Sequence, residues 1–420
     1  MAIQISIAST DSAGRIVLGW TPMQATLRFL NGPGPAVSVP AVATSTGSGG
    51  GLVLSTSRTH RGGRTLALEI PGDGSPVQFW VAGEFGRPSS DIGDAAIRIT
   101  DSATGADLGG TIATVRIRKD AQSLAPVERD RFLAAFGMLN ARGTGRFRDY
   151  RDMHVQSTLG ESHGDRGFLP WHRIYLLDLE RDLQAIDPIV TLPYWRFDQP
   201  APSIFAAAFM GTPDNVGRLQ FTPGHPFFTW QTDGKPGISR TPNFPVALAP
   251  PGLIGEQALI RSTSSFEGAS PQSGFRFMEG DPHGYAHTSF RGPISNPATA
   301  PRDPLFFLLH ANVDRLWAKW QWFRRRWSDS DPDAFPLTGV APAGHNIGDT
   351  MWPWNGVVVG TRPPTAPGGA LSPSTLTTAP GPAPTVRASL DYGGVLGGPV
   401  LGFDYDDVPF EMPDTAAVTG

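Results

Sequence analysis

The first part of the chain alternates short apolar runs with turn signals. Glycine- and proline-rich pieces such as Gly-Pro-Gly, Gly-Ser-Gly-Gly-Gly and Pro-Gly-Asp-Gly separate the runs. Runs of this length and separation are typical of antiparallel β structure. The pattern predicts an antiparallel β-sandwich with strands near Ile3–Ile7, Ile16–Trp20, Ala25–Leu30, Leu52–Leu54, Thr65–Ile70, Val77–Val81, Ala95–Thr100 and Thr111–Ile117.

The hydrophobic period changes from about residue 123 onward. Apolar residues then recur at the three- and four-residue spacing of an amphipathic helix. Residues 199–276 are instead rich in Pro, Gly and Thr, and we expect long loops there. Helices are predicted over Glu128–Leu139, Trp171–Ile186 and Asp303–Trp327, and a shorter one is expected to open at Pro282–His287.

These two patterns predict a multidomain α+β protein. Residues 1–115 are assigned to the β-sandwich domain, whose role the sequence does not indicate. Residues 116–420 are assigned to a mainly helical domain, with a core over about 116–330 and a Pro- and Gly-rich C-terminal extension over 331–420. A chain of 420 residues, of which 40% are hydrophobic, is long enough to fill such cores.

Composition excludes several classes of partner and chemistry. The formal net charge of −4 provides no general attraction to nucleic acid or to an anionic membrane, so neither is expected as a partner. Apolar stretches are too short for a membrane span, and the N-terminus lacks the features of a secretory signal, which favours a cytoplasmic protein. The chain has no cysteine, and this removes disulfides, thiolate metal sites and cysteine nucleophiles.

Six of the nine histidines fall into two groups of three, which we call the first triad and the second triad. The first triad is His154, His163 and His172, each nine residues from the next, and the second triad is His283, His287 and His310. Neutral imidazole is a common metal ligand, and three imidazoles leave a coordination position for substrate or dioxygen. Two triads predict two metal ions that share a small bridging molecule. Of the other histidines, His225 is expected to be structural and His345 to lie on the surface.

The donor types narrow the choice of metal. Imidazole ligation without carboxylates suits copper, and neither triad shows the Glu-x-x-His spacing of carboxylate-bridged di-iron sites. Zinc bound by three histidines is the competing interpretation. Paired three-histidine sites nevertheless favour dioxygen chemistry over hydrolysis.

The segments around the triads resemble those of the tyrosinase and polyphenol oxidase family. Phe168-Leu-Pro-Trp-His172-Arg is similar to the family's first copper-binding motif. Asp303-Pro-Leu-Phe-Phe-Leu-Leu-His310, continuing to Trp317, is similar to the second, and Pro282-His283-x-x-x-His287 matches the remaining ligands of that site. The resemblance covers about residues 115–408, so most of the predicted β-sandwich lies outside it.

This resemblance implies a mainly helical bundle around a dinuclear type-3 copper centre, with copper A on the first triad and copper B on the second. The implied activity, of the catechol oxidase or tyrosinase type, oxidises o-diphenols to o-quinones with dioxygen. Glu279 stands where some members keep a glutamate that holds a water able to accept a phenolic proton. Gly284 stands where hydroxylating members often carry Asn or Asp, so the resemblance favours diphenol oxidation over monophenol hydroxylation.

Three alternatives stay open from the sequence. The same centre would serve an o-aminophenol oxidase, which sequence does not separate from a catechol oxidase. Paired copper sites of this type also bind dioxygen reversibly in non-enzymatic carriers where substrate access is blocked. A binding protein with a vestigial copper site is the third alternative, and retention of all six histidines counts against it. A small phenol and dioxygen are the expected partners, and the sequence predicts no oligomeric state.

Overall fold

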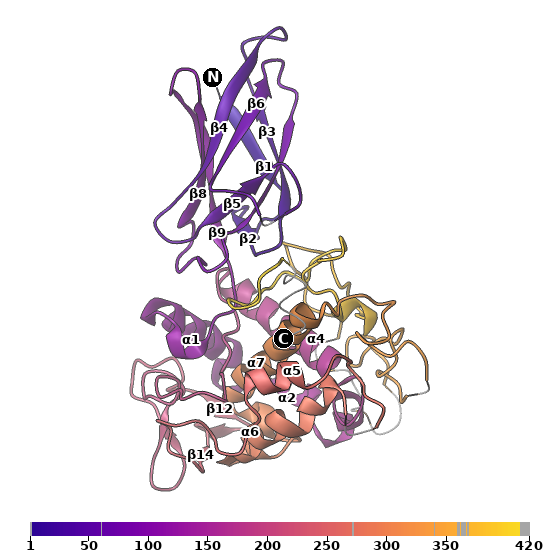
Figure 1. Ribbon diagram of the computed structural model, residues 1–420. Helices are drawn as coiled ribbons and strands as arrows, with labels where there is room; N and C mark the ends of the chain where they lie inside the picture. The colour runs from indigo at the N-terminus through magenta and orange to yellow at the C-terminus, as the bar shows by residue number, and fades with distance from the viewer. Residues whose placement is uncertain are drawn as a thin grey trace. The chain divides into compact units, whose positions relative to one another are not determined.

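The computed structural model describes residues 2–59, 61–270, 273–339, 341–358, 362, 367 and 369–411. The chain divides into two compact units. Unit 1 contains Met1–Ile117 together with the later segments Ser374–Thr378 and Gly393–Glu411, and unit 2 contains Arg118–Pro373 and Ala379–Tyr392. Strands dominate unit 1 and helices dominate unit 2 (Figure 1). The predicted succession of a β-rich region and a mainly helical region is confirmed.

The strands of unit 1 form two sheets (Figure 1). One sheet has the order β1-β3-β7-β5 and the other the order β2-β9-β8-β4-β6. Neighbouring strands run antiparallel except β2 and β9, which pair in parallel. The strands are β1 Ile3–Ile7, β2 Ile16–Leu18, β3 Met23–Phe29, β4 Ser38–Thr46, β5 Leu52–Ser55, β6 Thr65–Pro71, β7 Val77–Gly83, β8 Ala95–Asp101 and β9 Asp107–Val115.

Strand β4 is the one that the hydrophobic pattern did not predict. Its residues alternate between buried and more exposed positions, as a strand requires. The buried positions carry only small side chains, Val39, Ala41, Ala43 and the polar Ser45, and Pro40 is a residue that sheets disfavour. The strand is instead stabilised by pairing with β6 on one side and β8 on the other. Its position therefore depends on partners that local sequence does not reveal.

Both sheets contribute to a single apolar core in unit 1. Trp20, Leu27, Phe79, Val81 and Ile97 are buried within it. Burial of side chains of this size contributes roughly 1.5–3 kcal/mol each relative to exposure. Apolar residues of the strands that the sequence pattern predicted form this core.

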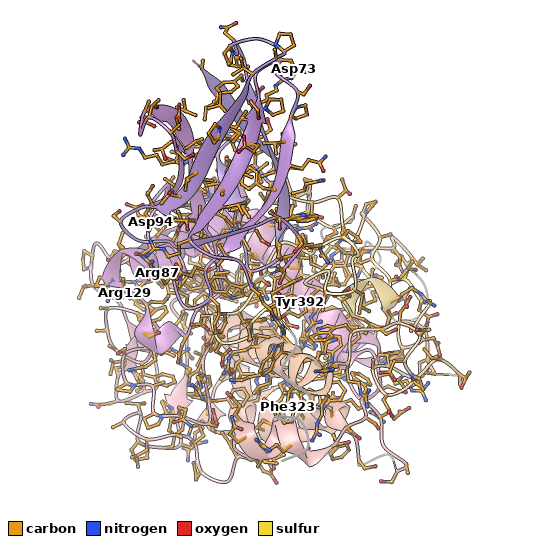
Figure 2. The ribbon with its side chains drawn as sticks, turned by 45° about the horizontal axis from the view of Figure 1, so that its top comes forward. Asp73, Arg87, Asp94, Arg129, Phe323 and Tyr392 are labelled. Atoms are coloured by element: carbon orange, nitrogen blue, oxygen red, sulfur yellow. The ribbon has the colours of Figure 1, made fainter. Side chains whose placement is uncertain are left out.

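The loop before β8 is organised by one carboxylate. Asp94, labelled in Figure 2, accepts hydrogen bonds from the backbone N–H groups of Gly50, Ser90 and Asp91 at 3.0 to 3.2 Å. These bonds satisfy backbone donors that the sheets leave unpaired.

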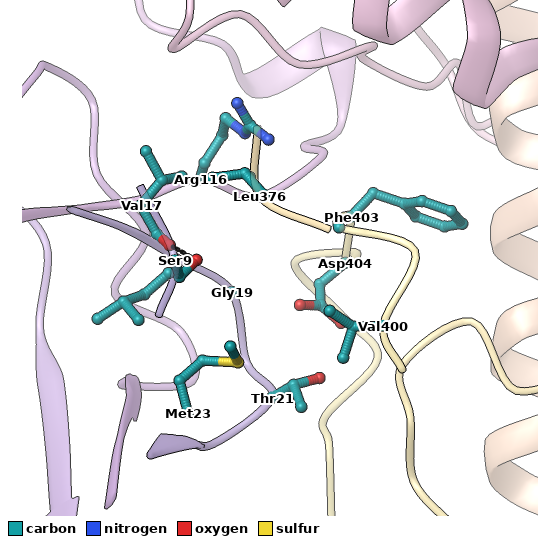
Figure 3. Close-up of a pocket in the computed structure, with 12 residues that line it drawn as sticks. Ser9, Val17, Gly19, Thr21, Met23, Arg116, Leu376, Val400, Phe403 and Asp404 are labelled. Atoms are coloured by element: carbon teal, nitrogen blue, oxygen red, sulfur yellow. Dashed lines mark hydrogen bonds between the residues drawn. The ribbon is translucent and has the colours of Figure 1, made fainter. Parts of the chain in front are cut away.

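The C-terminal segments complete unit 1. The backbone N–H of Trp20 donates to Asp404 Oδ2, and its indole Nε1–H donates to the carbonyl of Tyr405, both at 2.8 Å. Gly19 permits this approach, because a Cβ there would lie 2.1 Å from the Asp404 carboxylate. A small hollow forms at this place (Figure 3), lined by Ser9, Val17, Leu18, Gly19, Thr21, Met23, Arg116, Leu376, Val400, Gly402, Phe403 and Asp404. The hollow includes neither triad.

Unit 2 contains helices joined by long loops with short strand pairs. The predicted helices near 128–139, 171–186 and 303–327 are confirmed as α1, α4 and α7. The α-helices are α1 Pro126–Asn140, α2 Phe147–Met153, α3 Leu159–Ser162, α4 Phe168–Ile186, α5 Glu256–Ser262, α6 Tyr285–Thr288 and α7 Leu305–Arg324. The short strands are β10 Thr212–Pro213, β11 Leu219–Gln220, β12 Gln231–Thr232, β13 Lys235–Pro236, β14 Thr241–Pro242 and β15 Phe290–Arg291. Within the described part of the chain, no helix has both the length and the hydropathy needed to cross a bilayer.

Helices α4 and α7 are joined by buried charges. Arg173 on α4 donates to Asp314 on α7 through Nε at 2.5 Å, and its guanidinium lies 3.7 Å above the Trp317 ring. Arg118 binds Asp314 at 3.2 Å and Glu180 at 2.8 Å. The four charged side chains are at most 1% exposed. Removing one partner from such a network leaves an uncompensated buried charge, so the loss of any member would destabilise the packing of the two helices.

Candidate metal centre

The first triad draws its histidines from three different local structures. His154 ends α2 with a non-helical backbone, φ −125°. His163 follows α3 in extended backbone. His172 lies inside α4, which begins at Phe168. The regular nine-residue spacing therefore reflects no repeated element, although the possible ligand atoms of the three residues all lie within 4.8 Å of one another.

The second triad uses one compact turn and one long helix. His283 lies in the π turn Gly280–Gly284, and His287 follows one turn later in α6. Residues four apart in such a turn point to the same side, so both rings face the same point. His310 is fully buried in α7. The ligand atoms of this triad also lie within 4.8 Å of one another, so the structure brings all six predicted histidines into two sets of three.

Backbone carbonyls orient four of the six rings. The Nδ1–H of His154 donates to Pro297 O and that of His172 to Phe168 O, both at 2.9 Å. The Nδ1–H of His283 donates to Glu279 O and that of His287 to Ile294 O, both at 2.7 Å. A neutral imidazole has a single N–H, so each of these rings presents a lone pair at Nε2. Metal-binding histidines are commonly oriented in this way. The Nδ1 atoms of His163 and His310 are buried and have no hydrogen-bond partner among the described residues.

The Nε2 atoms of each triad face one another at short distance. Those of His154 and His172 are 3.4 Å apart, and both carry lone pairs because both Nδ1 atoms donate. Two lone pairs at this distance repel unless a cation lies between them. In the second triad, Nε2 of His310 lies 3.3 Å from that of His283 and 3.1 Å from that of His287. The protons of His283 and His287 are on Nδ1, so only His310 could place a proton between these atoms, and one proton cannot serve both contacts. The donor sets therefore fit one metal ion each.

Burial keeps these imidazoles neutral. It lowers the pKa of His154 and of His287 to about 4. Burial also holds the pKa of the other four imidazoles well below the usual range, and the neighbouring imidazoles lower it further. These four are His163, His172, His283 and His310. Neutral imidazole is the form that binds a metal ion.

The two triads adjoin through ring contacts. His172 and His310 stack with their centroids 4.2 Å apart and an interplanar angle of 13°. His163 and His283 are also neighbours, at 6.1 Å between centroids. Because α4 carries His172 and α7 carries His310, the packing of these helices sets the separation of the two sites. The arrangement is one dinuclear site rather than two separate mononuclear ones.

Two phenylalanines enclose the imidazoles. The centroid of the Phe168 ring lies 4.7 Å from that of His172 and 4.8 Å from that of His283, so this ring contacts both triads. The Phe306 ring lies 4.1 Å from His310, and both phenylalanines are fully buried. Apolar walls of this kind limit solvent access and lower the local dielectric around a metal site. The contact of Phe168 with both triads could not be predicted from its position in one motif.

Glu279 makes contacts on both sides of the site. Its backbone carbonyl accepts from His283, and its Oε1 accepts from the backbone N–H of Gly164 at 2.8 Å, next to His163. Burial raises the pKa of the Glu279 carboxyl to about 7, and the Gly164 hydrogen bond opposes the rise. A Cβ placed on Gly284 would meet only the Glu279 carbonyl, at 3.4 Å. Gly284 therefore leaves open space where a larger side chain would fit.

The prediction that His345 lies on the surface is wrong. The side chain is fully buried. Its Nδ1 accepts from Gly167 N–H and its Nε2 contacts Gly160 O, both at 2.8 Å. The segment Ala-Gly-His-Asn has the composition of an exposed turn, and its burial depends on a loop almost two hundred residues earlier in the chain. His225 has the structural role that was predicted, with backbone hydrogen bonds to Phe209 and Phe227.

Comparison with known proteins identifies relatives of unit 2. A family profile described as "Common central domain of tyrosinase" matches residues 144–323, which contain all six histidines. The chain is 32% identical over 263 residues to the tyrosinase of Streptomyces antibioticus, a match that covers 57% of this chain and 93% of the relative. It is 32% identical over 267 residues to the tyrosinase of Streptomyces glaucescens, covering 57% and 92%.

Among solved structures, a functional unit from octopus hemocyanin aligns with a TM-score of 0.46 and 21% identity. The alignment covers 70% of this chain and 69% of that one.

Proposed function

The chain belongs to the tyrosinase family, whose members are copper-dependent phenol oxidases, and from this premise we propose that it oxidises o-diphenols to o-quinones with dioxygen. The family's cofactor is a dinuclear copper centre, and the two triads fit its copper A and copper B sites. We assign copper A to the first triad and copper B to the second. When bound, the copper ions supply dioxygen activation and accept the electrons of the phenol.

The observation that carries the proposal is the joining of two all-imidazole sites by the stacked rings of His172 and His310. Each site presents Nε2 lone pairs that converge on one point without a cysteine or carboxylate donor. Nitrogen donors of this kind suit copper, and adjacent sites suit a bridging dioxygen better than a hydrolytic water. Zinc also binds to three imidazoles, and metal analysis of the loaded chain distinguishes it from copper.

The chain's own residues hold the reacting groups and exclude water. The backbone carbonyls fix the tautomers of four rings, and Phe168 and Phe306 enclose the centre. Conversion of an o-diphenol to an o-quinone releases two protons with two electrons, so a proton acceptor is needed close to the substrate. We propose that Glu279 orients a water that takes a phenolic proton, because its carboxylate is held beside the His163 loop by Gly164 N–H.

Substrate preference is proposed from Gly284. Its missing side chain cannot help to hold the water beside Glu279, so the step that a monophenol requires before oxidation is poorly supported. An o-diphenol already carries both oxygens and avoids that requirement. An o-aminophenol carries one oxygen and one nitrogen in the same arrangement and is the alternative substrate.

We also propose that residues 1–115 form a β-sandwich domain and that residues 116–420 form the copper domain around a helix bundle. The shared apolar core of the two sheets supports the sandwich. The C-terminal segments Ser374–Thr378 and Gly393–Glu411 are an exception to this division, because they group with the strands. Limited proteolysis tests whether these segments group with the strands: after cleavage on both sides of unit 2, the fragment with residues 1–117 should copurify with a fragment that contains Gly393–Glu411.

The test of the proposed function is turnover by the copper-loaded chain. Catechol, a monophenol and an o-aminophenol are offered in parallel, and the coloured quinone or quinone imine is followed by absorbance. Faster turnover of catechol than of the monophenol supports the proposal, and faster turnover of the o-aminophenol supports the alternative. Copper loading and oxygen binding without turnover of any of the three would contradict oxidase function and favour a dioxygen carrier.

A further inference from the structure

His345 binds both ends of the loop that carries His163. The imidazole accepts from the N–H of Gly167 at Nδ1, and its Nε2 lies 2.8 Å from the carbonyl of Gly160. An amide N–H only donates and a carbonyl only accepts, so the ring is the neutral tautomer with its proton on Nε2. Both ring nitrogens are therefore used, and the side chain is fully buried.

The two contacts hold the chain before and after His163, a copper A ligand. Gly160 lies in α3, three residues before His163. Gly167 is the residue that precedes α4, five residues before His172. The loop passes very close to the His345 segment. A Cβ on Gly167 would lie 2.8 Å from His345 Nδ1, so only glycine fits there.

The turn that presents His345 is itself well held. The Asp349 carboxylate accepts hydrogen bonds from the backbone N–H groups of Gly344 and Asn346 and from the Asn346 side chain, at 2.8 to 3.1 Å. Asn346 also exchanges two hydrogen bonds with the backbone of Ala341. His345 therefore projects from a fixed base rather than from a loose chain.

His163 needs support of this kind more than its partners do. His154 and His172 each donate Nδ1–H to a carbonyl, whereas Nδ1 of His163 has no partner among the described residues. His163 is also less buried than the other two, and a chain without cysteine has no thioether to fix its ring. The orientation of His163 therefore depends on the path of its loop.

We propose that His345 is a positioning residue for copper A, which holds the Gly160–Gly167 loop so that His163 faces the metal. The proposal rests on the proposed copper centre. It assigns a role in the metal site to the region 331–420, which lies outside the copper-binding motifs. His345 does not touch the metal, and it acts through the loop.

Copper titration of the apo chain, read by competition with a chelator and by electron paramagnetic resonance, tests the proposal. His345→Phe keeps a ring but removes both hydrogen bonds. It should weaken copper A by roughly ten- to a hundredfold and leave copper B unchanged, so that a mononuclear Cu(II) signal appears at intermediate copper. His345→Gln offers one acceptor and one donor at a similar separation and should restore most of the affinity.

His225→Phe is the matched control, because His225 makes the same pair of backbone contacts away from the triads. Its copper binding should equal that of the wild type. Wild-type affinity at both sites in a folded His345→Phe variant would overturn the proposal. Should that variant not fold, Gly167→Ala displaces the ring sterically, and unchanged copper A affinity there overturns the proposal equally. Failure of the wild type to bind two copper ions would instead overturn the proposed function.

Discussion

The two triads contain the same donor atoms, yet the chain builds them differently. His283 and His287 of the second triad come from successive turns, and both rings donate to carbonyls close by in sequence. The first triad is collected from a helix end, a loop and a helix interior. Nδ1 of its His163 has no hydrogen-bond partner among the described residues, as is also true of Nδ1 of His310 in the second triad. Nearby backbone therefore orients two rings of the second triad. In the first triad only His172 donates to a nearby carbonyl, and His154 donates to the distant Pro297 O.

The two sites should therefore be sensitive to changes in different parts of the chain. A change in the π turn or α6 should act on copper B directly, and few distant residues should matter. Copper A should respond to changes in the His345 turn, in Glu279 and in the packing of α4, although none of these provides a ligand. The four predictions below test this asymmetry.

Loss of one imidazole should have the largest effect. His163→Ala and His287→Ala each leave two nitrogens in one triad, which are too few for a stable site. Each variant should bind about one copper ion per chain and show no detectable catechol turnover, as measured by metal analysis and oxygen uptake. A variant that retained two copper ions and full turnover would remove that histidine from the ligand set.

Loss of the Asp314 carboxylate should come next, and it should affect both triads. Asp314→Ala leaves the fully buried Arg173 guanidinium without its carboxylate and should lower the free energy of unfolding by about 3–5 kcal/mol. Asp107→Ala is the control, because its bridge to Arg98 is exposed and its loss should change the free energy of unfolding much less. Urea unfolding of both variants measures the difference. Equal effects would contradict the importance of the buried network.

Glu279→Gln separates a proton-handling role from a structural one. Glutamine keeps an oxygen that accepts from Gly164 N–H, but it no longer carries a charge. We expect kcat for catechol to fall roughly a hundredfold with copper binding unchanged. Glu279→Ala also removes the tether and should in addition weaken copper A. Wild-type kcat in the Gln variant would exclude the proposed role in proton transfer.

Gly284→Asn should have the smallest effect and act near copper B. The backbone at Gly284 is helical, with φ −60°, and the nearest atom to an added Cβ lies at 3.4 Å, so the side chain fits without strain. One new hydrogen bond to a water, of about 1 kcal/mol, should raise the ratio of monophenol to diphenol turnover roughly fivefold. An unchanged ratio in a fully copper-loaded variant would show that Gly284 does not set the preference.

The same contrast explains what could be predicted from the sequence. Four of the six histidines are recognisable from the sequence because they stand in long motifs or at a helical spacing. His154 and His163 are recognisable by their nine-residue spacing from each other and from His172. The helices that carry His172 and His310 were also predicted, since their apolar period is long and strong. These features depend on residues that are near one another in the chain.

The features that were missed depend on residues far apart. The acceptors of Nδ1–H are backbone carbonyls, such as Pro297 O for His154, and a carbonyl has no signature in a sequence. His345 looked exposed because its neighbours are turn residues, and its burial depends on Gly160 and Gly167. Strand β4 depends on β6 and β8, and the C-terminal segment around Asp404 depends on Trp20. Pairing over such distances cannot be recognised from local composition.

If the two triads form one dinuclear site, they should hold a coupled pair of copper ions. Titration of the apo chain with copper, followed by electron paramagnetic resonance of the oxidised protein, tests it most directly. We predict saturation at two copper ions per chain, with the spectrum silent at saturation because two neighbouring Cu(II) spins cancel through a shared bridge. Saturation at one ion, or two ions that each give a full mononuclear Cu(II) signal, would contradict the claim.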